Sequence, residues 1–348
     1  MNTEIAYRQT YLDVLKTISV FFVVVVHISA INFSRINIET ANWFACNVYD
    51  SIAHFSAPVL FMISGALFLN PKKKVTITTI WKKNILRIFI AFFFWSITYA
   101  VAEIVLKSTN NNVFDSRVFL MAVIKGHYHL WFCHAIIFCY IVTPILRQII
   151  IDENIRKYLL YVSITIVFIV NFFKFIPLLD VIFTTICADA GIVFGGYVCY
   201  FILGHYLNQM TISVKWGGIS VIGLIALAIT ITGTAVLSWN YGKATEMLYG
   251  YLLPNTLLWS SSVFVLVKKY MNNMSKKSKL LYMRLANHSF GAYLVHVFVY
   301  NALLKIGLTP TICNSFIAIP ILSITTWTVS IMVSVIIKRI PMIGYFIV

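Results

Sequence analysis

The stretch "YLDVLKTISVFFVVVVHIS", residues 11–29, decides how the rest of the chain is interpreted. It is long and apolar enough to cross a bilayer, because a transmembrane helix needs about 20 predominantly apolar residues. It nevertheless contains Asp13, Lys16 and His27. A charged side chain at the centre of a bilayer costs at least ~2.5 kcal/mol. Three titratable side chains in one apolar helix therefore indicate a functional site.

Composition also indicates a membrane protein. The 348 residues are 60% hydrophobic and 11% charged, whereas soluble domains are about 45–50% apolar and about 25% charged. Most of the net charge of +16 lies in short loops between apolar runs, where lysine and arginine orient helices. This placement argues against nucleic acid as a partner. The nucleotide-binding motifs GxGxxG and GxxxxGK[ST] are absent, as is HExxH, and we predict no metal site.

Ten apolar runs predict an all-α integral membrane protein in which residues 1–348 form a single transmembrane domain. Of the 27 lysines and arginines, 18 fall in alternate loops on one side and 7 on the other, while Lys16 and Arg87 lie within runs. The positive-inside rule then predicts that both termini are cytoplasmic. The runs lie near 10–31, 47–69, 81–106, 129–150, 157–176, 188–208, 215–237, 246–267, 285–304 and 313–337.

The titratable residues of the first run have a regular spacing. Lys16 and His27 are eleven positions apart, so they share one helix face and are separated by about 16 Å along the axis. Lys16 is predicted near the cytoplasmic end and His27 towards the outer end. Asp13 precedes Lys16 by three residues and can reach it as an i,i+3 pair.

Six segments, in order along the chain, carry a resemblance to a known family. They are "RQTYLDVLKTISVFFVVVVH" (8–27), "FSAPVLFMISGALFLN" (55–70), "WKKNILRIFIAFFFW" (81–95), "HLWFCHAIIFCYIVTPIL" (129–146), "NHSFGAYLVHVFVY" (287–300) and "IKRIPMIGYFIV" (337–348). The chain resembles the acyltransferase 3 family of integral membrane acyltransferases over nearly its whole length. Lys16 stands where that family has an arginine; it keeps the charge and loses the planar fork.

The resemblance implies an enzyme of the bacterial inner membrane. Such an enzyme takes an acyl group, usually acetyl from acetyl-CoA, and delivers it to a hydroxyl of a surface polysaccharide, a lipopolysaccharide or a lipid-linked saccharide. It implies acyl-CoA as co-substrate, with no permanently bound cofactor. Succinyl transfer is an alternative within this class. A proton-coupled transporter of a polysaccharide or a small organic acid is the alternative outside it, although no inverted repeat is detectable.

The resemblance also suggests roles for the polar residues. Removal of a hydroxyl proton needs a base, and His27 is the best one, acting directly or through an acyl-histidine. Asp13 would position Lys16 at the inner mouth. Coenzyme A is polyanionic, and the cations predicted to bind its phosphates are Arg87, Lys82, Lys83 and Lys72.

Further candidates fall in the predicted outer half of the bundle. The family signatures suggest that His129 and Trp131 bind the substrate, together with His296, which lies about midway through the ninth run. Other polar residues of that half are His54, Glu103, His134, Asp189 and Glu246. Distances between helices cannot be derived from the sequence, and the acceptor sugar and the oligomeric state stay open.

Overall fold

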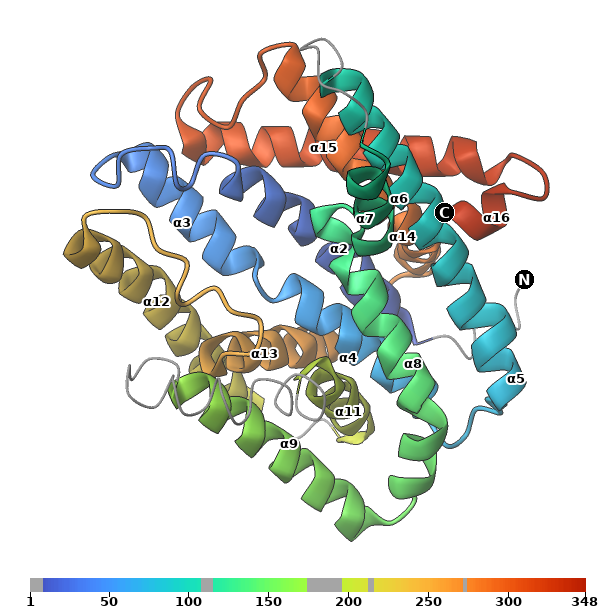
Figure 1. Cartoon of the computed structure of the whole chain (residues 1–348). Helices are drawn as coiled ribbons and strands as arrows, with labels where there is room; N and C mark the ends of the chain where they lie inside the picture. The colour runs from blue at the N-terminus through green and yellow to red at the C-terminus, as the bar shows by residue number, and fades with distance from the viewer. Residues whose placement is uncertain (1–8, 108–114, 174–195, 212–215, 272–273) are drawn as a thin grey trace.

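The computed structural model describes residues 9–107, 115–173, 196–211, 216–271 and 274–348, and these ranges contain helices and no strand (Figure 1). The first half of the chain forms α2 (Thr10–Ala30), α3 (Ala41–Ala53), α4 (Ser56–Phe68), α5 (Ile77–Thr79), the π-helix η1 (Ile80–Ile85), α6 (Leu86–Lys107), α7 (Ser116–Lys125), the 3₁₀ turn η3 (Tyr128–Leu130), α8 (Trp131–Ile149) and α9 (Glu153–Phe173). The second half forms α11 (Gly196–Gln209), α12 (Trp216–Tyr241), α13 (Pro254–Tyr270), α14 (Lys276–Lys305), α15 (Ser315–Lys338) and α16 (Gly344–Ile347).

Several of these helices are long and apolar enough to cross a membrane. Within the described ranges, 6 candidate spans meet this criterion: Thr10–Ala30, Ala41–Phe68, Ile77–Val105, Ser116–Ile149, Gly217–Tyr241 and Ser315–Lys338. The chain is therefore an all-helical, multi-pass membrane protein.

Two helices do not begin where the predicted spans begin. α13 begins at Pro254 rather than near residue 246, because proline fits the first turn of a helix and disrupts its interior. α14 begins at Lys276 rather than near residue 285. Its first turns are rich in good helix formers, but they are too highly charged for hydropathy to detect.

The predicted span 47–69 is interrupted at His54 and Phe55, where α3 ends and α4 begins. Pro58 has no amide hydrogen to donate to the carbonyl of His54, which breaks the helical ladder there. The end of predicted span 157–176 and the start of 188–208 lie outside the described residues.

α2 lies at the centre of the bundle. It packs against α14, α4, α3, α15 and α13, and 72% of its span is buried, against 28% for α12. Figure 1 shows α9, α11, α12 and α13 on one side of α4, and α6, α14, α15 and α16 on the other. The titratable residues of α2 are therefore surrounded by other helices.

Two glycines allow α4 and α11 to pack backbone against backbone. A Cβ on Gly65 would lie 1.7 Å from the carbonyl oxygen of Phe201, and a Cβ on Gly204 would lie 2.0 Å from that of Met62. Small residues at such crossings are typical of membrane helices, because close approach maximises van der Waals contact. This packing fixes one wall of the cavity described below.

The loop that follows α4 is held in place by Arg147 of α8. Its guanidinium donates hydrogen bonds to the carbonyls of Phe68 at 2.6 Å, Asn70 at 3.0 Å and Lys73 at 2.8 Å. Arg147 thus orders the basic loop as well as contributing to the charge asymmetry.

Candidate functional site

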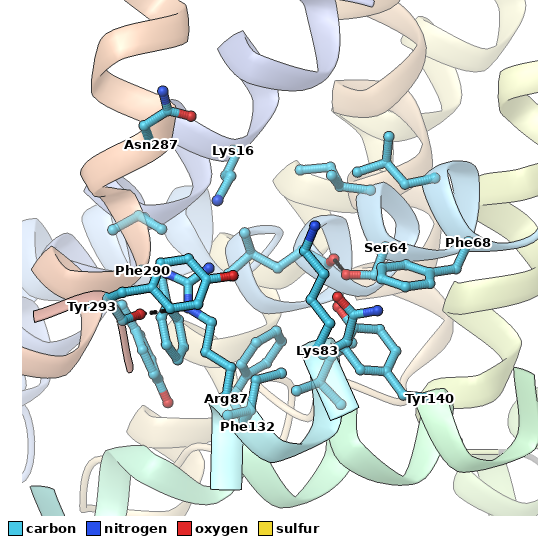
Figure 2. Close-up of a pocket in the computed structure, with 18 of the residues that line it drawn as sticks. Lys16, Ser64, Phe68, Lys83, Arg87, Phe132, Tyr140, Asn287, Phe290 and Tyr293 are labelled. Atoms are coloured by element: carbon cyan, nitrogen blue, oxygen red, sulfur yellow. Dashed lines mark hydrogen bonds between the residues drawn. The ribbon is translucent and has the colours of Figure 1, made fainter. Parts of the chain in front are cut away.

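A cavity of about 330 Å³ opens between α2, α4, η1, α6, α8, α14, α15 and α16. Four basic side chains line it, Lys16, Lys83, Arg87 and Lys338, and its described lining contains no carboxylate. Figure 2 shows Lys16, Lys83 and Arg87 around the same space, which they reach from three different helices. Four basic side chains around one cavity favour binding of an anion.

The guanidinium of Arg87 is oriented by the segment that contains α16. Its Nε donates to the carbonyl of Tyr345 at 3.1 Å and its Nη2 to the backbone oxygen of Val348 at 2.6 Å. The guanidinium carbon also lies 4.8 Å from the centre of the Tyr345 ring, within the range of a cation–π interaction. A neighbouring bond from Trp95 Nε1 to the carbonyl of Ile347, 2.8 Å long, holds the same segment. These contacts fix one cation of the cavity.

Apart from the basic side chains, most of the cavity lining is apolar. On the α2 side that leads towards His27 it includes Val20, and α4 and α8 contribute Leu60, Ile63, Phe132 and Ile136. An apolar slot below a cationic mouth suits a ligand with an anionic head and a slender arm.

Three histidines lie together beyond this apolar part. The ring centres of His27 and His296 are 5.1 Å apart, those of His296 and His129 are 5.2 Å apart, and those of His27 and His129 are 6.3 Å apart. His129 is 1% exposed and His296 is fully buried. His27 lies seven residues beyond Val20 on α2, about 10 Å along the axis. Three helical segments thus bring together residues that are far apart in sequence.

The hydrogen bonds of His296 determine which of its nitrogens is basic. Its Nδ1 lies 2.6 Å from the carbonyl oxygen of Tyr293, so Nδ1 carries the hydrogen and Nε2 the lone pair. The Nε2 atoms of His296 and His129 are both buried, and neither has a hydrogen-bond partner in the described part of the chain. The cluster therefore offers proton acceptors in a water-poor setting.

Tyr293 joins the cavity to the histidine cluster. Its side chain lines the cavity, its hydroxyl donates to the carbonyl of His129, and its own carbonyl accepts the bond from His296. Tyr293 and Phe132, whose rings meet edge to face at 5.8 Å, stand between the cavity and the histidines. One residue thus connects the anion-binding end to the basic end.

The structure separates Trp131 from its sequence neighbour His129. Trp131 packs against Tyr197 at 5.0 Å and Tyr251 at 5.4 Å between ring centres, and Tyr251 stacks in turn on His54. The 3₁₀ turn η3 that precedes α8 directs the two side chains to different surroundings.

Three of the residues predicted at the inner, donor-binding end do not line the cavity. Lys72 and Lys82 are exposed, Lys82 next to Lys83 on η1, and Asp13 is buried on α2 three residues before Lys16. Conversely, Lys338 and Tyr293 line the cavity but were not predicted as site residues. Their only signals in the sequence were the basic charge of Lys338 and the two quoted segments, 337–348 and 287–300, that contain them. Asp189 lies outside the described residues.

Within the described ranges, no group of three His, Cys, Asp or Glu side chains is placed to hold a metal ion.

The comparisons with known proteins identify the family. A family model described as an acyltransferase domain, that of acyltransferase 3, matches residues 9–337, nearly the whole chain. Neither the curated proteins nor the solved structures contain a match. The match includes the three histidines and the helices of the cavity except α16, and it ends one residue before Lys338. The chain is therefore a membrane protein that belongs to the acyltransferase 3 family.

Proposed function

We propose that the chain transfers an acyl group from acyl-CoA to a hydroxyl of a cell-surface or lipid-linked saccharide in the bacterial inner membrane. The observation that supports this most is the position of Tyr293, which connects a cationic cavity to a cluster of histidines. In this proposal residues 1–348 form one domain of ten spans with both termini in the cytoplasm. The cavity then faces the cytoplasm, where acyl-CoA is found, and the histidines lie towards the outside.

The donor binds with its phosphates at the mouth of the cavity. Lys16, Lys83, Arg87 and Lys338 supply the positive charge, and Asp13 positions Lys16. A cavity of about 330 Å³ accommodates the acyl-pantetheine arm and leaves the nucleotide at the entrance. The exposed Lys72 and Lys82 attract the polyanion from outside the cavity.

The acyl group is acetyl rather than succinyl. The arm places its acyl end in the deep part of the cavity, which is lined by apolar residues such as Val20, Ile63 and Phe132. A succinyl carboxylate there would be buried without a cation, because the basic residues of the lining lie at the mouth with the phosphates.

Transfer occurs at the histidine cluster in one displacement. His27 takes the proton of the acceptor hydroxyl while the hydroxyl oxygen attacks the thioester carbonyl, the C–S bond breaks, and the thiolate of CoA leaves. The partners His129 and His296 orient the acceptor hydroxyl through their buried Nε2 atoms. Trp131 holds the saccharide by an apolar contact further out.

Radiolabelled acetyl-CoA tests this proposal in membranes that contain the chain. The label should enter extracted lipid-linked saccharide or polysaccharide with the wild type. With His27→Gln it should enter at less than about one hundredth of that rate, because general-base catalysis contributes about 10²–10⁴-fold. Equal incorporation by His27→Gln, at equal protein abundance, would refute the proposal.

A further inference from the structure

A row of polar side chains leads from the histidine cluster to the surface. Nδ1 of His129 lies 2.9 Å from Nδ1 of His127, a hydrogen bond in which one imidazole donates and the other accepts. Nε2 of His127 then lies 3.7 Å from Oε1 of Glu103 on α6. The side chain of Glu103 is 50% exposed, whereas that of His127 is 13% exposed. The row therefore starts at a buried base and ends at an exposed carboxylate.

The ring of His127 is held in this row by its neighbours. Tyr99 of α6 stacks on it at 4.5 Å with an interplanar angle of 22°. The centre of the Tyr128 ring also lies 4.5 Å from that of His127, and the hydroxyl of Tyr128 is hydrogen-bonded to that of Tyr300 on α14. An imidazole that is fixed with one nitrogen on a histidine and the other facing a carboxylate can pass a proton by exchanging tautomers.

We infer that His127 and Glu103 carry the proton of the acceptor hydroxyl from the histidine cluster to water at the outward face. This inference rests on the proposed function. His27 passes the proton it has taken to His129, with which it shares the cluster, and His129 passes it to His127. Glu103 receives it from His127 and releases it to water. The row returns His27 to its neutral form for the next turnover.

The atoms balance without another reactant. The O–H bond of the acceptor breaks, an ester C–O bond forms and the thioester C–S bond breaks. The thiolate withdraws with the arm through the open mouth of the cavity and takes a proton from water there. The competing route would return the proton of His27 directly to the thiolate, and in that case His127 and Glu103 would have no influence on the rate.

The test uses the full chain in nanodiscs with acetyl-CoA as donor and water as acceptor, and follows the release of the CoA thiol. His127→Ala should lower kcat about tenfold or more with KM unchanged, and Glu103→Gln should lower kcat by a smaller factor. Added imidazole should restore at least half of the rate lost in His127→Ala, because a mobile base replaces the missing one. His134→Ala is the matched control: this histidine of α8 packs on Phe92 at 4.3 Å, and its substitution should leave kcat unchanged.

The outcomes separate the two proposals. If the wild type releases CoA and His127→Ala does so equally fast, or is slowed without any response to imidazole, the relay is overturned and the proposed function stands. If the folded wild type releases no CoA, the proposed function and the relay fall together.

Discussion

Two adjacent lysines give the sharpest test of the donor site. Lys83 lines the cavity and Lys82 does not, although both are exposed residues of the π-helix η1. Replacing either by alanine removes the same charge from the same helical turn. If the cavity binds the phosphates of acyl-CoA, only Lys83→Ala should weaken binding appreciably.

Coulomb's law gives the expected change in the binding free energy of the donor. A lysine about 4 Å from a phosphate gains ~1 kcal/mol in a water-like dielectric, which corresponds to about a fivefold change in Kd. At about 10 Å the same charge gains ~0.4 kcal/mol before screening, and a Debye length of about 8 Å reduces this further. We therefore expect about a fivefold higher Kd for Lys83→Ala and less than a twofold change for Lys82→Ala.

Isothermal titration calorimetry of nanodisc-embedded protein with acetyl-CoA measures the Kd of each variant, at low and at physiological salt. The half-buried Arg87 extends the series. Arg87→Lys keeps the charge but loses the planar fork and the two backbone bonds that orient it. It should raise Kd about tenfold, because one hydrogen bond from the guanidinium to a phosphate contributes about 1.5–3 kcal/mol. Equal changes in Kd for Lys82→Ala and Lys83→Ala would show that the phosphates of acetyl-CoA do not bind in the cavity.

Two further predictions concern packing and coupling. Gly65→Ala places a Cβ 1.7 Å from the carbonyl oxygen of Phe201 and should destabilise the fold by about 1–3 kcal/mol, seen as a lower Tm in detergent. Gly217→Ala, where a Cβ meets nothing within 4 Å, should not lower Tm, and equal losses would refute close packing of α4 on α11. Tyr293→Phe removes the hydroxyl that donates to the carbonyl of His129. It should leave acetyl-CoA binding within twofold and slow CoA release about five- to tenfold, the worth of one buried hydrogen bond; unchanged release would argue against coupling through Tyr293.

Hydropathy predicted most of the helices, because a span must be apolar along its length. Hydropathy did not predict where two helices begin. α13 begins at Pro254, because proline fits the first turn of a helix. α14 begins in charged residues that favour a helix without being apolar. The break in the predicted span 47–69 was signalled by Pro58 and was missed, because hydropathy averages over it.

The sequence predicted which site residues share a face of one helix. It did not predict which residues of different helices lie close together. The 16 Å spacing expected for Lys16 and His27 follows from helical geometry, and the two residues do lie at the cavity and at the histidine cluster respectively. The placement of Lys338 beside Arg87 around one cavity depends on how α15 packs, which no local pattern specifies. The division between His129 and Trp131 was also unpredictable, since a 3₁₀ turn changes where neighbouring side chains point.

The central claim is that His27 performs the chemistry while the cavity binds the donor. The most direct measurement is acetyl-CoA binding and CoA release by the wild type and by His27→Gln, both in nanodiscs and with their Tm compared. The account predicts binding equal within twofold and CoA release about 100-fold slower or more in His27→Gln. A folded wild type that binds no acetyl-CoA, or a His27→Gln variant that releases CoA at the wild-type rate, would contradict it.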